Sequence, residues 1–320
     1  EVNESECRSG QVMKKVLVTG GGGLVGNSIK RISQSYDYDF VFTTREDGNL
    51  TVESDVRDLF EKHKPDYVIH TAAKVGGIAG NLSAQADFFY QNLLMNAYMI
   101  HHAAVNNVEK FFAFTSVCVF RDGKEMEESN MHASPPFEAN FAYAHAKRMV
   151  DVQIRAYKDQ YKVNNYCSII PGNIFGENDL FDLASGHVIP SLIHKMYKAK
   201  HEGGDFVVWG DGSAIREFLY VDDISRIILQ LLEKKDIPER LLISGETQYS
   251  IKEIAETLKE VAEYPREVVY DTSKPKGQAA RKSNLTLLKS LFPEFEFTNL
   301  KESLKKSYLW FENNYPNVRL

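Results

Sequence analysis

Short apolar runs alternate with segments of helical periodicity along the first half of the chain. The runs are rich in β-branched and aromatic residues, which favours buried strands, whereas apolar positions every three or four residues favour helices. Strands are predicted at 14–20, 39–44, 66–73, 110–116 and 166–171, and helices at 24–34, 55–63, 85–107 and 141–161. This alternation predicts parallel strands with right-handed crossovers, and therefore an α/β fold with a doubly wound, Rossmann-type sheet.

Beyond Pro171 the alternation becomes irregular. Gly- and Asp-containing loops at 172–186 precede predicted helices from about 188 and at 220–235, 250–263 and 300–314, and predicted strands at 205–210 and 241–245. We therefore expect a Rossmann domain at 13–171 and a smaller mixed α/β, mainly substrate-binding lobe at 172–320, with 211–245 packing back onto the Rossmann domain. Residues 1–12 are polar and patternless, and we expect a disordered leader there.

Composition narrows the class of protein. The 320 residues are 43% hydrophobic and carry a net charge of −6, with Lys and Arg spread along the chain. Nucleic-acid-binding surfaces are typically basic and clustered, so that class is disfavoured. No apolar run approaches the roughly 18 residues of a membrane helix. Three separated cysteines make neither a disulfide framework nor a metal knuckle, so we expect no metal site and a reducing, cytoplasmic setting.

A glycine-rich segment, VTGGGGLVG, joins the first predicted strand to the first predicted helix. Gly20, Gly23 and Gly26 fit the pattern G-x-x-G-x-x-G. Glycines at these positions permit a tight turn and a close backbone approach to a pyrophosphate, and the helix N-terminus supplies N–H donors. A Gly-rich turn without function is the alternative. The strand–turn–helix context favours dinucleotide binding.

The end of the second predicted strand bears on the choice of dinucleotide. It reads FTTRED, so threonines and Arg45 stand where an NAD-binding protein typically has an acidic residue. A guanidinium there suits the 2′-phosphate of NADP, although a solvated surface arginine is the alternative. Asp55 lies further on and either flanks an adenine or begins a helix.

A tyrosine, a lysine and a serine form a candidate catalytic set. Tyr143 and Lys147, in YAHAK, share one face of a predicted helix. An ammonium group beside a phenol lowers the phenol's pKa, so that Tyr143 can exchange a proton with a carbonyl oxygen. Ser116 ends the preceding predicted strand, at the edge where such sheets bind ligands, and its hydroxyl can hold the same oxygen.

Cys118, in FTSVCVF, has two possible roles. A cysteine in an apolar, β-rich run is most often a small core residue, whereas a reactive thiol beside Ser116 is the alternative. The stretch is predicted to be a buried strand, and the i, i+2 spacing of Ser116 and Cys118 is compatible with both side chains facing one pocket.

These motifs resemble the extended short-chain dehydrogenase/reductase family, and within it the epimerase-reductases that act on GDP-4-keto-6-deoxy-D-mannose. The matching segments are TGGGGLVG (19–26), AAKVGGI (72–78), DFFYQN (87–92), SVCVF (116–120), NFAYAHAKRMVDVQ (140–153), NIFGENDLF (173–181), GHVIPSLIHK (186–195), VVWGDGSAIREFLYVDD (207–223) and SKPKGQAARK (273–282). The combination of AAKVGG, Ser-x-Cys and HVIP is far more selective than the Tyr-x-x-x-Lys pair.

The resemblance implies two reactions at one site. A carbonyl at C4 acidifies the hydrogens at C3 and C5, and inverting each centre takes a base and an acid. The family pattern assigns the base to Cys118 and the acid to His187. NADPH then reduces C4, with Tyr143 as proton donor, Ser116 holding the oxygen and Lys147 tuning the phenol. Read from the sequence alone, His187 is more readily a capped histidine at a helix start.

The resemblance also implies the binding residues. Cofactor contacts are expected from Gly20, Gly23, Leu24, Val25, Gly26, Arg45, Asn49, Leu50, Ala72, Ala73, Tyr143, Lys147, Pro171, Asn173, Ile174 and His187. Substrate contacts are expected from Ser116, Val117, Cys118, Asn173, Val188, Leu192, Lys195, Val208, Trp209, Arg216 and Arg281. The cations would neutralise the diphosphate, although ordinary surface charge, and core packing for Trp209, are the alternatives.

Several positions depart from the family pattern. Val117 replaces a hydroxyl residue, Gly22 replaces an arginine of bacterial relatives, Gly172 replaces a threonine and Lys195 replaces an arginine. The resemblance also implies a homodimer through the helices at 85–107 and 141–161. The alternatives are an enzyme for another nucleotide 4-keto sugar and a non-catalytic NADP-binding regulator, which would typically have lost Tyr143 or Lys147.

Overall fold

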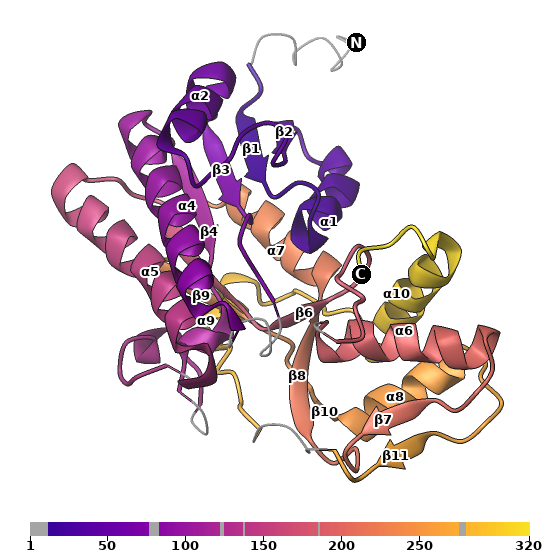
Figure 1. The fold of residues 1–320 in the computed structure, drawn as a ribbon. Helices are drawn as coiled ribbons and strands as arrows, with labels where there is room; N and C mark the ends of the chain where they lie inside the picture. The colour runs from indigo at the N-terminus through magenta and orange to yellow at the C-terminus, as the bar shows by residue number, and fades with distance from the viewer. Residues whose placement is uncertain (1–11, 77–82, 122–124, 137, 185, 275–279) are drawn as a thin grey trace, which may run out of the picture.

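The main sheet has six parallel strands. The computed structural model describes residues 12–76, 83–121, 125–136, 138–184, 186–274 and 280–320, so all but one residue of the expected leader lies outside it. The strands are ordered β2 (Asp39–Thr43), β1 (Lys15–Thr19), β3 (Tyr67–His70), β4 (Lys110–Phe114), β5 (Tyr166–Pro171) and β9 (Arg240–Ile243). The predicted doubly wound α/β fold is confirmed (Figure 1).

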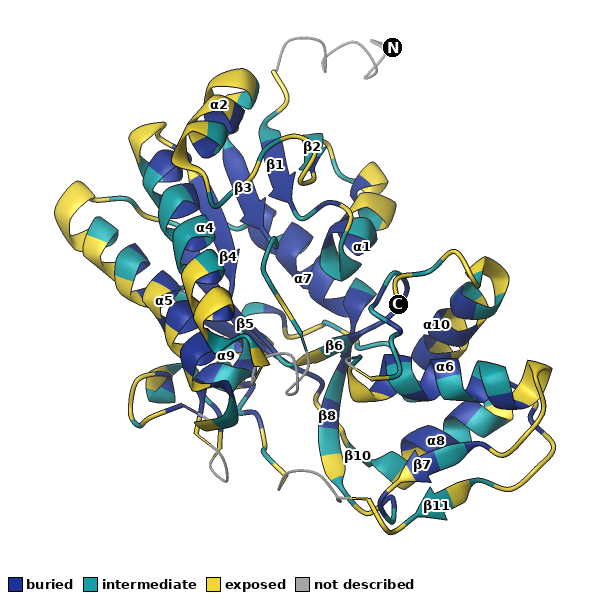
Figure 2. Cartoon of the chain, in the orientation of Figure 1, coloured by how far each residue is buried: buried dark blue, intermediate teal, exposed yellow. Residues whose placement is uncertain are grey.

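Helices cover both faces of this sheet, as a parallel sheet requires. One layer contains α2 (Glu53–His63), α4 (Gln85–Val105) and α5 (Phe141–Tyr161), and the other contains α1 (Leu24–Ile32) and α7 (Val221–Glu233) (Figure 1). Alternation along β1 divides the core between them: Leu17 packs in the cluster with α2, α4 and α5, and Val16 and Val18 pack in the cluster with α1 and α7. Figure 2 shows β1, β3 and β4 between these layers as mostly buried.

The strand that precedes the candidate catalytic residues ends earlier than predicted. β4 ends at Phe114 rather than at 116, and Val117–Val119 form a 3-10 turn instead. The Ser116 hydroxyl accepts a hydrogen bond from the Cys118 backbone N–H at 3.2 Å. This local bond offers the backbone a partner outside the sheet. The strand-based argument that Ser116 and Cys118 share a face was therefore wrong.

A smaller lobe follows Pro171. Its strands form a three-stranded sheet, with β6 (Asn173–Phe175), β8 (Ile215–Tyr220) and β10 (Gln248–Ser250), and a two-stranded sheet, with β7 (Val207–Trp209) and β11 (Val269–Asp271). Its helices α6 (Val188–His201), α8 (Ile251–Val261) and α10 (Leu300–Asn314) enclose a second core. Ser250 and Glu253 form a reciprocal capping box at the start of α8. The strands β6, β8, β10 and β11 were not predicted.

The chain returns to the main sheet between parts of the smaller lobe. α7 packs against α1, β9 pairs with β5, and α9 (Thr286–Leu291), which was not predicted, packs against β9. The division at residue 171, with 211–245 assigned to the Rossmann domain, remains a proposal. Over the described residues, no helix has both the length and the apolar character needed to span a membrane.

Gly172 joins the two parts of the chain at a crowded position. A Cβ placed there would lie 2.4 Å from the Ser244 Oγ and 3.0 Å from the Ser244 Cβ. The Gly172 N–H donates to the Ile243 carbonyl at 2.8 Å, which holds Gly172 beside Ser244. The threonine typical of the family would not fit against Ser244. The pair Gly172 and Ser244 therefore accounts physically for one departure from the family pattern.

Gly172→Ala is expected to lower the free energy of unfolding by about 1–3 kcal/mol through overpacking. Ser244→Gly removes both close atoms, so the double variant should recover much of this loss. Denaturant unfolding of the two single variants and the double variant measures the coupling energy. Strictly additive effects would show that Ser244 is not the cause of the crowding.

Candidate active site

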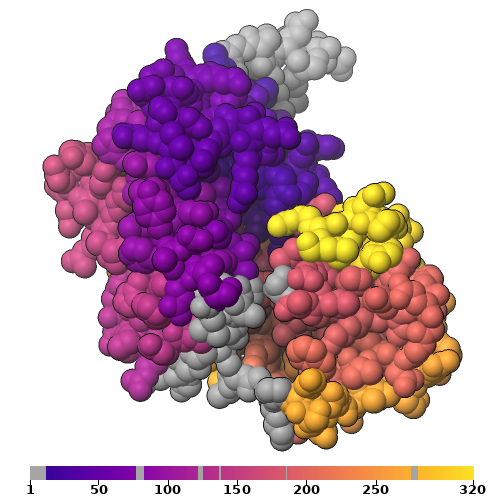
Figure 3. All heavy atoms as spheres, viewed as in Figure 1, coloured from indigo at the N-terminus to yellow at the C-terminus, as the bar shows by residue number. Residues whose placement is uncertain are grey.

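The candidate site lies where strand order reverses. β1 is flanked by β2 on one side and by β3 on the other. The chain connections therefore run to opposite sides of β1, and they diverge at its carboxyl end. Open α/β sheets bind ligands at this kind of switch point. Figure 3 shows a recess between the body formed by the first half of the chain, in indigo to magenta, and the smaller lobe, in salmon.

The glycine loop folds so tightly that segments of its own backbone lie against each other. Gly20 has φ +69°, and a Cβ on Gly26 would lie 2.2 Å from the Gly20 carbonyl oxygen. Gly23 begins α1 without a side-chain cap, and the first turn, which starts Leu24-Val25, carries no acidic residue. The first N–H groups of α1 are therefore left for an anion, and the loop fits a dinucleotide pyrophosphate.

A buried polar network joins this loop to the end of β3. Thr71 Oγ1 donates to the Thr19 carbonyl at 2.7 Å, and the Ala72 N–H donates to Thr19 Oγ1 at 3.3 Å. His70 bridges Thr19 Oγ1 at 2.7 Å and Asn96 Oδ1 at 2.9 Å, and burial lowers its pKa to about 3. A neutral His70 thus holds the two strand ends together. Sequence analysis missed this network, although polar residues inside apolar strands were the available signal.

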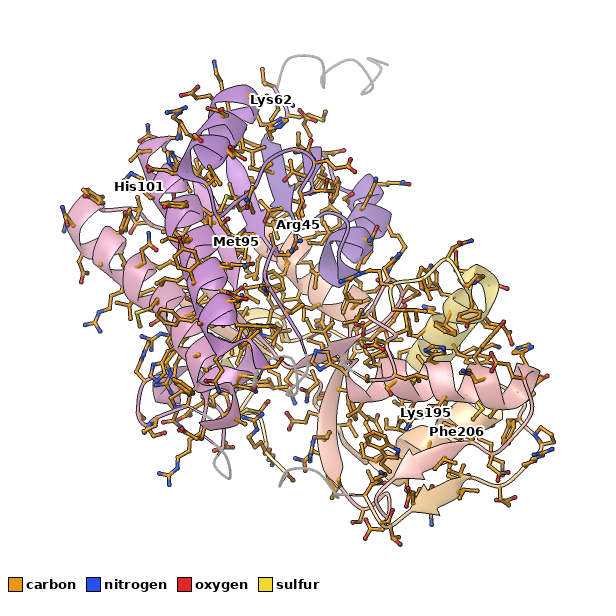
Figure 4. The ribbon with its side chains drawn as sticks, viewed as in Figure 1. Arg45, Lys62, Met95, His101, Lys195 and Phe206 are labelled. Atoms are coloured by element: carbon orange, nitrogen blue, oxygen red, sulfur yellow. The ribbon has the colours of Figure 1, made fainter. Side chains whose placement is uncertain are left out.

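The loop after β2 also abuts the glycine loop. The Gly21 N–H donates to the Thr43 carbonyl at 2.9 Å, which places the following Arg45 beside α1 (Figure 4). Arg45 and Asn49 are exposed, and Leu50 is half-buried. Asp55 accepts from the Asn49 N–H at 2.9 Å and lies in the first turn of α2, so it anchors this loop.

Ser116, Tyr143 and Lys147 come together in one cluster. Lys147 is buried, its Nζ donates to the Phe114 carbonyl at 2.9 Å, and it lies 5.7 Å from the centroid of the Tyr143 ring. Desolvation lowers the pKa of Lys147 to about 8. Burial, and then the charge of Cys118, raise the pKa of Tyr143, whereas a hydrogen bond with Ser116 lowers it. The expected lowering of the Tyr143 pKa by Lys147 is not found, because burial has the largest effect on the pKa of both groups.

Cys118 is the accessible thiol of this cluster. It is half-buried, whereas its neighbours Val117 and Val119 are 5% and 0% exposed. The Asn140 amide Nδ2 donates to the Cys118 Sγ at 3.3 Å. Cys167, in contrast, is fully buried in β5, where burial raises its pKa well above the usual value. The core-residue interpretation therefore fits Cys167 and not Cys118.

His187 comes from the smaller lobe. It precedes α6 at the end of that helix nearest the main sheet (Figure 1), and its side chain makes no capping hydrogen bond. The alternative of a capped histidine therefore does not hold. The side chain is exposed, yet desolvation lowers its pKa.

Cationic and aromatic side chains of the smaller lobe form a second group. Lys195 Nζ lies 4.4 Å from the centroid of the Trp209 ring, and Lys274 Nζ, which sequence analysis missed, lies 5.7 Å from it. Trp209 is 56% exposed, so the core-packing alternative is wrong. Burial lowers the pKa of Lys195, whose place on α6 Figure 4 shows. Arg216 is half-buried on β8.

Arg281 connects a distant segment to the Cys118 turn. Its Nη1 donates to the Val117 carbonyl at 3.3 Å. The Val117 side chain packs in the core, so this residue presents its backbone and not its side chain to the site. Leu192 and Val208 are also core residues. The remaining candidates are placed as follows: Ala73 and Ile174 are half-buried, Pro171 is buried, and Asn173 and Val188 are exposed.

Comparisons with known proteins agree with this arrangement. The model of the NAD dependent epimerase/dehydratase family matches residues 16–244. A GDP-L-fucose synthase of Dictyostelium discoideum is 36% identical, over 96% of this chain and 98% of that protein. A GDP-L-colitose synthase of Yersinia pseudotuberculosis is 30% identical, over 95% and 99%.

Structural comparison gives the same assignment. The crystal structure of a GDP-L-fucose synthetase from Naegleria fowleri bound to NADP superposes with a TM-score of 0.90 at 34% identity, covering 96% of this chain and 95% of that one. This chain thus combines the sheet order, the glycine loop at the switch point and the Ser116–Tyr143–Lys147 cluster. Its relatives match it along nearly their whole length. The chain belongs to the NAD dependent epimerase/dehydratase family and, within it, to the group that contains the GDP-L-fucose synthases.

Proposed function

We propose that this protein is a GDP-L-fucose synthase, which converts GDP-4-keto-6-deoxy-D-mannose to GDP-L-fucose by 3,5-epimerisation and NADPH-dependent 4-reduction. One observation carries the proposal: the accessible Cys118 thiol lies in the same cluster as Ser116 and Tyr143. A reductase needs the serine and the tyrosine, whereas an additional thiol base is needed only where a carbon next to the carbonyl is inverted.

The cofactor half of the site suits NADPH. The glycine loop and the uncapped start of α1 would hold the pyrophosphate, and the exposed Arg45 would bind the 2′-phosphate. The bound dinucleotide supplies the hydride for C4. Lys147 would bind the nicotinamide ribose, and its ammonium would stabilise the Tyr143 phenolate left after the phenol protonates the C4 oxygen.

Epimerisation uses the same oxygen site. Cys118 would remove the proton at C3 or C5 as a thiolate, and His187 would return a proton from the opposite side. Negative charge then develops on the C4 oxygen, where Ser116 and Tyr143 donate hydrogen bonds. Desolvation strengthens the His187 imidazolium as an acid, because it lowers the imidazole pKa.

The smaller lobe would bind GDP. Trp209 offers an exposed aromatic face, and Lys195 and Lys274 bring two positive charges to it. Arg216 and Arg281 would neutralise the diphosphate in a chain whose net charge is −6. We place the protein in the cytoplasm as part of this proposal, since nucleotide sugars and NADPH are water-soluble.

Incubation of the protein with GDP-4-keto-6-deoxymannose and NADPH in D₂O tests both activities together. We expect deuterium at C3 and C5 of the product, with NADPH consumed. NADPH consumption without deuterium would indicate a plain reductase, and deuterium without NADPH consumption a plain epimerase. Neither event would support a non-catalytic NADP-binding regulator.

An enzyme for another nucleotide 4-keto sugar is the second candidate. It is favoured by the similarity to a GDP-L-colitose synthase, whose name gives a different GDP sugar as product. Ratios of kcat/KM between GDP-4-keto sugars decide between the two, because they report differential binding of the transition state. A higher kcat/KM for a sugar other than 4-keto-6-deoxymannose would favour this second candidate.

The outer face of α5 suits a homodimer. Phe141, Met149 and Val152 are 41%, 37% and 46% exposed and share one helical face, and Phe89 and Tyr90 of α4 are 38% and 61% exposed. α4 packs beside α5, so these side chains extend over two adjacent helices (Figure 1). Such a patch is typical of a subunit interface.

Met149→Asp combined with Val152→Asp is expected to convert a dimer to a monomer in sedimentation at micromolar concentration. Two charges at the centre of an apolar interface would be buried without partners. Val52→Asp is the matched control, because Val52 is 41% exposed and directly precedes α2, outside the two helices that carry this patch. A wild-type chain that sediments as a monomer would contradict the proposed dimer.

A further inference from the structure

Asn140 lies against the sulfur of the proposed base. It precedes α5 directly, its Nδ2 donates to the Cys118 Sγ at 3.3 Å, and the residue is only 8% exposed. The Sγ therefore lies beside both an amide donor and the N-terminus of a 21-residue helix. Sequence analysis did not single out Asn140, since nothing in the pattern connects it to a cysteine 22 positions earlier.

The Asn140 amide contacts Cys118 instead of capping α5, because Asn140 ends a 3-10 turn (Glu138–Asn140) that runs directly into this helix. Asn is a favoured N-cap residue, yet the Asn140 side chain makes no capping hydrogen bond to α5. Its Oδ1 is buried and has no hydrogen-bond partner among the described residues. A buried acceptor without a partner costs about 1–3 kcal/mol, so this placement of the amide lowers the stability of the folded state. The contact that the side chain does make is the one to Cys118.

We propose that Asn140 is the positioning residue that holds Cys118 in its thiolate form and aims it at the sugar carbon. A hydrogen-bond donor favours the charged form of its acceptor, and the positive end of a helix dipole acts in the same direction. This inference rests on the proposed function for the identity of the sugar, but the Asn140–Cys118 contact does not depend on it.

Other groups near the thiol act differently. The Ser116 hydroxyl accepts a hydrogen bond from the Cys118 N–H. The charge of Cys118 raises the pKa of the Tyr143 phenol, which lies on α5. Arg281 also reaches this turn, where its Nη1 donates to the Val117 carbonyl. In proton abstraction the thiolate takes H⁺ from carbon, the C–H electron pair moves toward the C4 oxygen, and the Asn140 amide is unchanged.

Alkylation of Cys118 with iodoacetamide, measured against pH, tests the inference without substrate. Because only the thiolate reacts, the pH midpoint of the rate reports its ionisation. A Cys7→Ser background leaves the fully buried Cys167 as the other thiol. We expect Asn140→Ala to raise the midpoint by about one pH unit, which lowers the rate at pH 7 about tenfold, and Asn140→Asp to raise it further.

Two variants and a control keep the result interpretable. Asp has nearly the volume of Asn but no amide donor, so Asn140→Asp tests the donor without the loss of volume that Asn140→Ala brings. Asn164→Asp adds the same charge at an exposed position beyond α5 and should leave the midpoint unchanged. Midpoints of both Asn140 variants equal to that of the parent would overturn the inference.

The deuterium assay separates this inference from the proposed function. In the Asn140 variants, deuterium incorporation at pH 7 should fall with the alkylation rate and recover at higher pH. A loss that is equal at every pH would mean a merely structural role for Asn140 and would overturn the inference. A shifted alkylation midpoint with no deuterium incorporation even in the parent would contradict the proposed function alone.

Discussion

Cys118→Ser is expected to lower deuterium incorporation at C3 and C5 by about 10³-fold, which is the contribution of a well-placed general base. A serine hydroxyl keeps nearly the size of the thiol but ionises far less readily. The variant should still consume NADPH slowly and yield a 6-deoxy sugar reduced at C4 without inversion. Mass spectrometry of the product formed in D₂O measures both changes together.

Cys167→Ser is the matched control for this variant. Cys167 is fully buried in β5, away from the turn that contains Cys118. Its substitution should leave deuterium incorporation per folded molecule unchanged, whatever it does to stability. If Cys118→Ser retained the wild-type rate of incorporation, another residue would be the base.

Lys147→Met is expected to slow the reduction reaction and to remove an unfavourable buried charge from the folded state. Loss of a charged group that binds the cofactor and assists the phenol should lower the rate of NADPH oxidation about 10²–10³-fold. Burial lowers the Lys147 pKa from 10.5 to about 8, so the folded state bears a penalty for keeping it charged at neutral pH. Methionine fills a similar volume without that charge.

The pH dependence of stability tests this assignment. Between pH 8 and 10.5 the unfolded lysine holds a proton that the folded one has released, so the stability of the wild type relative to Lys147→Met rises with pH. The change from pH 7 to 10.5 should be about 3 kcal/mol, measured by denaturant unfolding. Lys30→Met, on the exposed side of α1, should give no such change. A constant difference for Lys147→Met would contradict a lowered pKa.

Periodicity predicted the elements that form the main sheet, because their apolar faces must be covered whatever the details of the loops. The helices α5 and α10 were predicted with nearly their observed bounds, since both carry long regular patterns. The strands β6, β10 and β11 have three residues each and depend on pairing with distant segments, so no local signal marks them.

The candidate site was predicted only in part. Motif spacing pointed to Ser116, Tyr143 and Lys147, and the structure places them in one cluster. Their electrostatics could not be predicted, because the pKa of Tyr143 depends on burial that the sequence does not express. Asn140 and Lys274 could not be found either, since their contacts come from three-dimensional packing.

The repeated passage of the chain between the main sheet and the smaller lobe limits how this protein can be altered. The smaller lobe is assembled from separate stretches, residues 173–220, 248–271 and 300–314, which are interrupted by β9 and α9 on the main sheet. No single excision or graft can therefore exchange the lobe as a unit. A change of nucleotide specificity by recombination would need matched replacements in all three stretches, whereas point substitutions at the recess leave the connections intact. Diversification of this architecture should therefore proceed residue by residue rather than by swapping modules.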